Sequence, residues 1–191
     1  MRVFQIGFNK CGTRTLYSFF RRNGKSAVHW QKGNIARTIF LNLANGRPII
    51  AGMDDVDVFT DMEWLTKEFC FEAYKLFPYF YREYPDAVFI LNTRDRERWI
   101  KSRIEHGNGS YLARSLHVLR IDSKEELVEF WRNDWDRHHA RVRDFFAANN
   151  GRFFEFDIEK EDGASLVAKL PDMNLKAELY AHQGATRKDE D

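Results

Sequence analysis

The chain has 191 residues, 43% of them hydrophobic and 15% aromatic, which suits one globular domain with a full core and excludes a disordered chain. Thirty lysines and arginines against 29 acids leave a formal charge of +1, so bulk electrostatics gives no reason to expect binding to nucleic acid or an anionic membrane. With two cysteines, no signal peptide and no membrane span, we expect a cytoplasmic protein whose residues 1–183 form the domain and whose polar residues 184–191 form a disordered tail.

The first predicted element is an apolar strand at residues 3–6, which runs into a loop from Gly7 to Gly12 and then into a helix that ends near Gly24. The backbone N–H groups of such a loop and of the first helical turn point at one spot, and the helix dipole adds partial positive charge. Lys10 and Arg14 add full charges. The segment therefore predicts a site for a phosphate-like anion, although glycine-bounded turns also occur for packing alone.

The glycine spacing of this loop matches the P-loop of ATPases, but the residues that follow the second glycine do not. That motif needs a lysine and then Ser or Thr, which reach the phosphates and hold magnesium. Here Thr13 and Arg14 follow Gly12, and the lysine, Lys10, lies inside the loop. The sequence therefore favours an anion site of a different kind from that of an ATPase.

Strands and helices alternate along the middle of the chain. We predict strands at residues 26–30, 48–53 and 56–60, and helices at residues 34–44 and 63–84, the second interrupted at Pro78. This alternation predicts an α/β fold with a P-loop-type parallel sheet flanked by helices in a single domain.

A second basic segment begins with a strand. Residues 85–94 form a continuous apolar run that ends in Arg94, as in a strand buried on both faces of a parallel sheet. Residues 95–103 are predicted to be helical, with acids early and bases late. Five lysines and arginines fall within residues 94–103. Taken alone, Arg94 fits a structural ion pair and Ser102 fits a solvated helix residue.

The longest predicted helix covers residues 124–148 and is opened by Ser123, with Glu126 three positions later as in a capping box. We interpret His138 and His139 as part of a solvated helix face, because adjacent helical positions point about 100° apart and do not converge on a metal. We therefore expect no metal site. The apolar stripe of this helix is predicted to pack against the sheet: Leu127, Phe130, Trp131, Trp135, Val142 and Phe145.

The loop residues Lys10-x-Gly12-Thr13-Arg14 resemble the 5′-phosphosulfate-binding loop of sulfotransferases that use 3′-phosphoadenosine 5′-phosphosulfate (PAPS). In that family an arginine at a strand's end and a serine eight residues later grip the 3′-phosphate of the nucleotide. Arg94 and Ser102 have this separation. Over about residues 3–172 the chain is similar to the small bacterial-type P-loop sulfotransferases.

The resemblance continues toward the C-terminus. Residues 152–157 and 163–170 are similar to the last core strand and helix of the family. One part of the family pattern is missing, because no Arg-Lys-Gly segment completes the nucleotide site, and Arg187-Lys188 in the polar tail is a poor substitute. The adenine pocket therefore stays unassigned.

The resemblance implies transfer of a sulfuryl group from PAPS, by in-line displacement and without a metal, to a hydroxyl or amine of a small-molecule or carbohydrate acceptor. A cysteine phosphatase is excluded because Tyr17 stands where an arginine would be needed. A P-loop kinase for small molecules or nucleosides, and a protein that binds the nucleotide without chemistry, stay open. The nucleotide contacts that the resemblance implies are Lys10, Cys11, Gly12, Thr13, Arg14, Thr15, Arg94 and Ser102.

Catalysis in this family needs a group that stabilises the departing phosphate oxygen and a base that accepts a proton. Lys10 suits the first role. Asp61, after the strand at residues 56–60, is our first choice of base, although an Asp in this position also suits a helix N-cap. The alternative bases are Asp55, Asp57 and His29, in that order.

Overall fold

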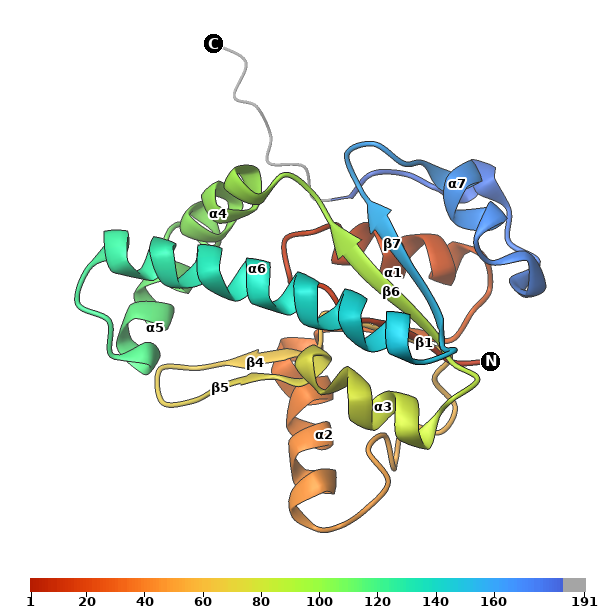
Figure 1. The fold of residues 1–191 in the computed structure, drawn as a ribbon, viewed down its shortest axis with the longest axis horizontal. Helices are drawn as coiled ribbons and strands as arrows, with labels where there is room; N and C mark the ends of the chain where they lie inside the picture. The colour runs from red at the N-terminus through yellow and green to blue at the C-terminus, as the bar shows by residue number, and fades with distance from the viewer. Residues whose placement is uncertain (184–191) are drawn as a thin grey trace.

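A five-stranded parallel sheet forms the centre of the computed structural model, which describes residues 1–183 (Figure 1). The tail at residues 184–191, which we expect to be disordered, lies outside this part of the chain. The sheet order is β2-β3-β1-β6-β7, so the α/β, single-domain prediction is confirmed. The strands are β1 (Val3–Gln5), β2 (Ala27–His29), β3 (Val58–Thr60), β6 (Val88–Thr93) and β7 (Arg152–Asp157).

Helices cover both faces of this sheet (Figure 1). Helices α1 and α7 pack on one face, and α2, α3 and α6 pack on the other. The helices are α1 (Thr13–Arg22), α2 (Asn34–Ala44), α3 (Phe77–Glu83), α4 (Arg96–Glu105), α5 (Ser110–Leu119), α6 (Lys124–Ala148) and α7 (Gly163–Ala168). Short 3₁₀ turns lie at Gln31–Gly33, Ala73–Leu76, Pro171–Met173 and Ala177–Leu179.

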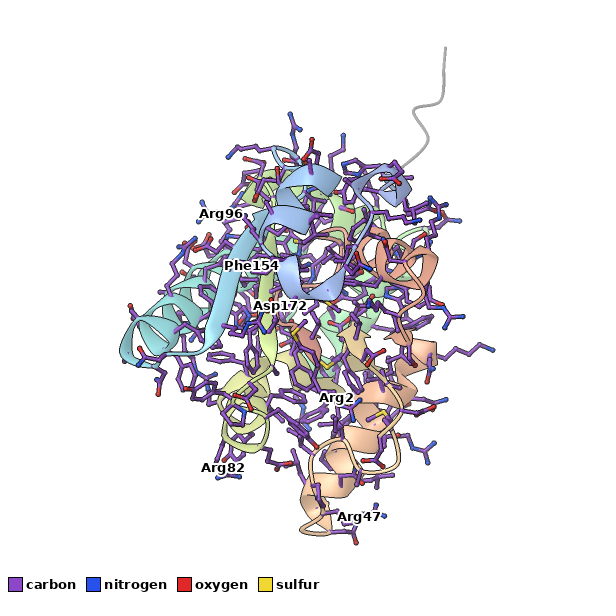
Figure 2. All side chains as sticks on the ribbon, turned by 90° about the vertical axis from the view of Figure 1, so that its right-hand side faces the viewer. Arg2, Arg47, Arg82, Arg96, Phe154 and Asp172 are labelled. Atoms are coloured by element: carbon purple, nitrogen blue, oxygen red, sulfur yellow. The ribbon has the colours of Figure 1, made fainter. Side chains whose placement is uncertain are left out.

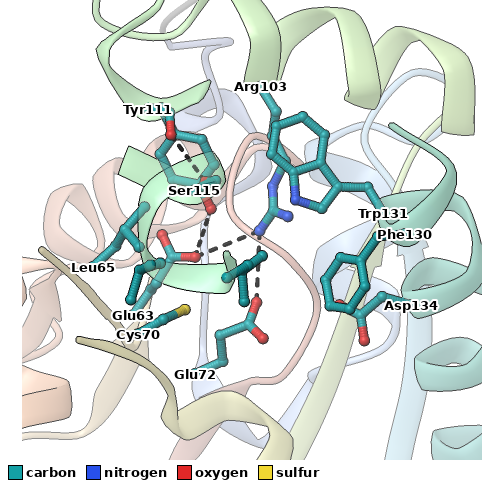
Figure 3. Close-up of a pocket in the computed structure, with 12 residues that line it drawn as sticks. Glu63, Leu65, Cys70, Glu72, Arg103, Tyr111, Ser115, Phe130, Trp131 and Asp134 are labelled. Carbon is teal, nitrogen blue, oxygen red and sulfur yellow. Dashed lines mark hydrogen bonds and ion pairs between the residues drawn. The ribbon is translucent and has the colours of Figure 1, made fainter. Parts of the chain in front are cut away.

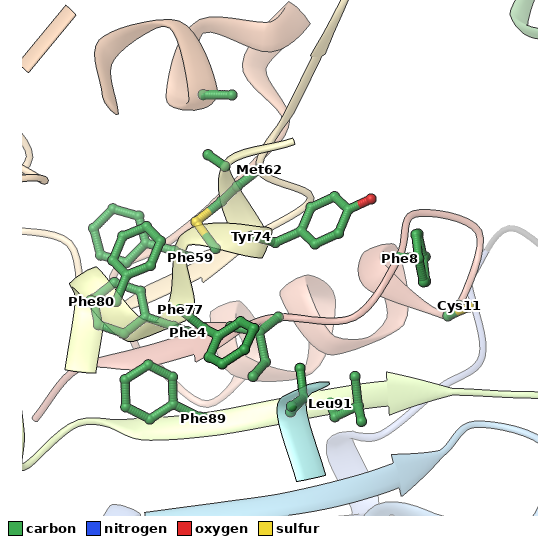
Figure 4. Close-up of a cluster of buried hydrophobic side chains, with 14 of the residues drawn as sticks. Phe4, Phe8, Cys11, Phe59, Met62, Tyr74, Phe77, Phe80, Phe89 and Leu91 are labelled. Atoms are coloured by element: carbon green, nitrogen blue, oxygen red, sulfur yellow. The ribbon is translucent and has the colours of Figure 1, made fainter. Parts of the chain in front are cut away.

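Successive strand residues point to opposite faces, so each central strand supplies both cores. In β1, Val3 packs with the side chains of α1, whereas Phe4 packs with those of α3. The larger core is rich in phenylalanine, as Figure 4 shows for Phe4, Phe8, Phe59, Phe77, Phe80 and Phe89. Charged side chains such as Arg47 and Arg82 project outward into solvent (Figure 2).

The predicted helix at residues 63–84 is wrong in its first half. Residues 63–72 form an antiparallel hairpin of β4 (Glu63–Leu65) and β5 (Cys70–Glu72), since aromatic side chains of the hairpin pack on Phe40 of α2. Pro78 does not interrupt a helix but lies in the first turn of α3, where its missing N–H costs no hydrogen bond. The predicted strand at residues 48–53 is also wrong, because this segment forms turns held by the Asn42 side chain.

Helix α6 begins as predicted, with the Ser123 hydroxyl accepting a hydrogen bond from the Glu126 N–H at 3.1 Å. Most of its apolar stripe is buried, but Phe130 is 37% exposed and does not join the core. The interpretation of His138 and His139 as solvated is wrong, because each is only 3% exposed.

The two histidines tie α6 to the ends of two central strands. The His138 Nε2–H donates to the Ile6 carbonyl at 2.7 Å, just before the glycine loop. The His139 Nδ1–H donates to Trp135 O at 2.9 Å, which leaves Nε2 to accept from the Thr93 hydroxyl at 3.2 Å, just before Arg94. Burial lowers the pKa of His138 to about 3 and that of His139 to about 4, so both are neutral at pH 7.

Candidate functional site

The loop between β1 and α1 lies at the carboxyl edge of the sheet and has the backbone of an anion site. Gly12 is the N-cap of α1 with a left-handed φ of 74°, and no side chain caps the first N–H groups of the helix. A Cβ at Gly12 would lie 2.6 Å from Ile158 Cγ2, so the loop has no room for a larger residue there. The uncapped amides of α1 are therefore free to bind an anion.

A buried asparagine that the sequence analysis missed holds this loop. The Asn92 side chain donates to Phe8 O at 3.1 Å and to Cys11 O at 2.8 Å, and it accepts from the Gly7 N–H at 3.0 Å. A Cβ at Gly7 would overlap Asn92. The available signal was a polar residue within the apolar run of β6.

The cations of the loop lie close together and are not neutralised by ion pairs within residues 1–183. Among residues 1–183, neither Lys10 nor Arg14 forms an ion pair with a carboxylate. Burial lowers the pKa of Lys10, and the neighbouring charges of Arg14 and Arg94 lower it further, while the Asp61 carboxylate acts in the opposite direction. The Lys10 ammonium donates to Nδ1 of His106, another residue that sequence reasoning missed, at 3.4 Å. Because adjacent positive charges repel, this arrangement favours binding of an anion between them.

The other loop residues contribute in different ways. Thr13 is 5% exposed, and its hydroxyl donates to Asp61 Oδ2 at 3.4 Å. The Thr15 hydroxyl instead accepts from the Gln183 N–H at 3.0 Å. The Cys11 thiol is fully buried in the apolar core, and burial raises its pKa, so Cys11 offers the site its backbone and not a thiolate.

Asp61 lies beside this loop. No helix follows it, because β4 begins at Glu63, so the N-cap interpretation is wrong. Its backbone is left-handed, with φ 54°, and its N–H donates to the Gln5 side chain at 2.8 Å. Burial raises the pKa of Asp61 to about 6, against the opposing effects of the Thr13 hydrogen bond and the Lys10 charge.

The other proposed bases lie in two places. His29 is near Asp61, with Nε2 3.7 Å from Asp61 Oδ2, and burial and Arg14 lower its pKa to about 4. Asp55 and Asp57 precede β3 and therefore lie at the amino ends of the parallel strands. This opposite edge of the sheet is roughly 10 Å from Asp61 along the strand. The Asp57 carboxylate accepts from the Ser26 N–H at 3.0 Å, and Asp55 is exposed.

The second basic motif reaches the loop. Arg94 follows β6, and its Nη1 donates to the Lys10 carbonyl at 3.1 Å. Its Nη2 donates to Glu159 Oε1 at 2.6 Å, a partner that the sequence analysis missed. Ser102 is partly exposed, two turns into α4. The fold thus brings Arg94 and the Lys10 loop together at one edge of the sheet.

A buried polar network, which the sequence analysis missed, holds the Asn9 side chain of the loop. Asn9 donates to Glu63 Oε2 at 2.6 Å, and Arg103 Nε donates to the Asn9 side chain at 3.0 Å. Figure 3 shows Arg103 pointing toward Glu63 and Glu72 in a pocket beside the β4–β5 hairpin. The Arg103 guanidinium is surrounded by four aromatic rings, those of Phe8, Trp99, Tyr111 and Trp131.

This buried network shifts the pKa of Glu63 and fixes the position of Asn9. Burial raises the pKa of Glu63 to about 7, although the charge of Arg103 opposes the shift. The Tyr111 hydroxyl donates to Glu63 Oε1 at 2.7 Å, and Trp99 Nε1 donates to the Asn9 carbonyl at 3.0 Å. Asn9 is therefore fixed on three sides, which fixes the backbone next to Lys10.

Comparison with known proteins agrees with this geometry. Residues 2–114, which are more than half of the chain and include the loop, Asp61, Arg94 and Ser102, match the family model described as a sulfotransferase domain. No curated protein matches the chain. Within residues 1–183 no helix is long and apolar enough to cross a membrane, and no group of three or more His, Cys, Asp or Glu side chains gathers as metal ligands. The chain belongs to the sulfotransferase domain family, which indicates sulfuryl transfer as its general chemistry.

Proposed function

We propose that the protein transfers the sulfuryl group of PAPS to a hydroxyl or amine of a small-molecule acceptor, for which a carbohydrate is one candidate. One observation carries this proposal: the Lys10 loop and Arg94 meet at one edge of the sheet, where the Arg94 guanidinium donates to the Lys10 carbonyl at 3.1 Å. Two separate groups of donors at this edge suit a nucleotide with two phosphate-bearing ends.

The loop supplies the stabilisation of the leaving group. In an in-line displacement, negative charge builds on the departing 5′-phosphate oxygen. The donors for this charge are Lys10, Arg14, the N–H groups of residues 11–15 and, once it turns from Asp61, the Thr13 hydroxyl. The contacts of Asn92 and Asn9 hold the loop backbone in place, so little reorganisation is needed when the charge develops.

Asp61 is the proposed general base. Its carboxylate lies at the same edge, 3.4 Å from the Thr13 hydroxyl, and is buried enough for its pKa to rise to about 6. Such a base is mostly ionised at pH 7 and accepts a proton better than an ordinary aspartate does. The His29 ring is 3.7 Å from the Asp61 carboxylate and is neutral at pH 7, because its pKa is lowered to about 4. This suits a role in orienting the carboxylate.

The second phosphate contact involves Arg94 and Ser102, for the 3′-phosphate. This contact distinguishes PAPS from ATP, which has no 3′-phosphate. The loop also has no Lys-Ser or Lys-Thr pair after Gly12, so the kinase alternative has less support from the residues.

Thermal unfolding with ligands tests the proposal. The product nucleotide 3′-phosphoadenosine 5′-phosphate (PAP) should raise the melting temperature, because a ligand that binds only the folded state stabilises it. ATP with magnesium should raise it much less. Stabilisation by ATP that equals or exceeds that by PAP, and that a chelator abolishes, would instead support a kinase.

A further inference from the structure

The side chain of Arg94, which is proposed to bind a phosphate, is already paired with a carboxylate of the protein, that of Glu159. Glu159 belongs to the segment between β7 and α7, and its carboxylate accepts from Arg94 Nη2 at 2.6 Å and from Arg98 Nη1 at 3.4 Å. It also accepts from the backbone N–H of Asp95 at 3.1 Å, at the start of α4. Two guanidinium groups and a helix N-terminal amide are the donors that a phosphate group would use.

The backbone around Glu159 is held in place. The Ile158 N–H donates to Thr93 O at 3.0 Å, and the Ile158 side chain packs against Gly12 of the loop. The Glu159 N–H donates to Asp157 Oδ1 at 3.0 Å. The segment is therefore fixed next to both phosphate motifs, while the Glu159 side chain is 20% exposed and so reaches solvent.

The carboxylate is charged at neutral pH. Burial acts to raise its pKa, but the Asp95 N–H and Arg94 outweigh this effect and lower it. A ligand phosphate that approaches Arg94 therefore meets a negative charge, and two like charges in contact cannot share one guanidinium without cost. Within residues 1–183 the Arg94 Nε atom is buried without a hydrogen-bond partner, so Glu159 leaves one donor of Arg94 unused.

We infer that Glu159 is a specificity-determining residue of the proposed nucleotide site: its carboxylate takes the place of the 3′-phosphate in the free protein, and a 3′-phosphate must displace it to bind Arg94. This inference rests on the proposed function. The displacement lowers the affinity for nucleotides that carry a 3′-phosphate. It therefore speeds release of the product PAP, which keeps this phosphate after sulfuryl transfer.

Calorimetry on the full chain tests the inference with Glu159→Gln, which removes the charge and keeps the shape. We expect Glu159→Gln to bind PAP about tenfold more tightly than the wild type and to bind adenosine 5′-phosphate, which lacks the 3′-phosphate, with unchanged affinity. Glu155→Gln is the matched control, because Glu155 lies on β7 and pairs with Arg143 at 2.7 Å, away from Arg94. It should bind both ligands as the wild type does.

Glu159→Ala serves as a second variant, and the melting temperature of each variant shows whether it is folded. If the wild type prefers PAP and both Glu159 variants bind PAP with equal or lower affinity, the carboxylate supports Arg94 instead of competing with the phosphate, and this inference alone is overturned. If neither the wild type nor the variants prefer PAP to adenosine 5′-phosphate, Arg94 takes no 3′-phosphate, and the inference and the proposed function both fail.

Discussion

The two basic motifs differ in how their charges are balanced. In the loop after β1, Lys10 and Arg14 form no ion pair with any carboxylate of residues 1–183, whereas Arg94 after β6 is paired with Glu159. Both motifs lie at one edge of the sheet, and both were predicted to bind phosphate. The difference shows that a motif predicts the presence of a charge, but the fold decides whether that charge is already neutralised. Substitutions at each motif test this difference.

The largest effect is expected at Asp61, on the side of the unpaired cations. Asp61→Asn should keep the fold and the PAP affinity but lower turnover by about 10² to 10⁴-fold, because general-base assistance is lost. Since the Asp61 pKa is about 6, wild-type kcat/KM should fall as the pH drops below 6, and the variant should lack this dependence. Single-turnover transfer to an acceptor found by screening measures both.

Asp55→Asn is the control for this experiment, because Asp55 is exposed at the opposite edge of the sheet and the substitution changes the charge equally. Near wild-type turnover in Asp61→Asn would remove Asp61 as the base and make its neighbour His29 the next candidate.

The next largest effect is expected at Lys10. Lys10→Ala should lower turnover by about 10² to 10³-fold, the usual loss when one donor to a developing negative charge is removed. PAP affinity should fall less than turnover, because the loop amides and Arg14 remain. An equal loss in PAP affinity and in turnover would mean that Lys10 binds the ground state as strongly as the transition state.

A smaller effect is expected at the paired motif. Arg94→Ala should weaken PAP binding by about tenfold, less than the value for an unpaired arginine, because Glu159 already competes for it. Ser102→Ala should weaken PAP binding less than Arg94→Ala does, since this substitution removes a neutral donor. Binding of adenosine 5′-phosphate should be almost unchanged in both, and calorimetry that showed equal losses for both ligands would make the two residues structural.

The smallest effect is expected from the histidines that hold the two motifs. The folded-state pKa of His138 is lowered to about 3, so the unfolded chain binds more protons between that value and about 6.5, and stability falls as the pH drops below 6.5. In His138→Gln this contribution is absent. Between pH 7 and pH 5.5 the wild type should lose about 1 kcal/mol relative to the variant, measured by urea unfolding. A difference that does not depend on pH would contradict the buried, neutral state of His138.

The strand-loop-helix units of both motifs could be predicted because their signals are local. An apolar run, a glycine and a basic first turn lie within a dozen residues at Lys10, and an apolar run that ends in Arg94 directly precedes the second predicted helix. Asp61 was selected as a candidate base for a similar reason, since polar residues after a parallel strand gather at one edge of the sheet. The family match over residues 2–114 confirms the resemblance that these segments indicated.

The errors concern contacts between distant segments. Glu159 lies 65 residues after Arg94, and no pattern near either residue indicates the pair. Arg103 was counted as one of the five basic residues of the segment 94–103, and Glu63 was assigned to a helix, so nothing in the sequence indicated their buried contact. The hairpin at residues 63–72 was missed because short aromatic-rich runs have no clear period until they pack on α2.

A crystal structure of the protein in complex with PAP would test most directly the claim that the Lys10 loop and Arg94 bind the two phosphates of the nucleotide. We expect the 5′-phosphate within hydrogen-bond distance of Lys10 and the N–H groups of residues 11–15, and the 3′-phosphate on Arg94 with the Glu159 carboxylate turned away. PAP bound elsewhere, or bound with its 3′-phosphate off Arg94 while Glu159 keeps its contact, would contradict the assignment of these two motifs.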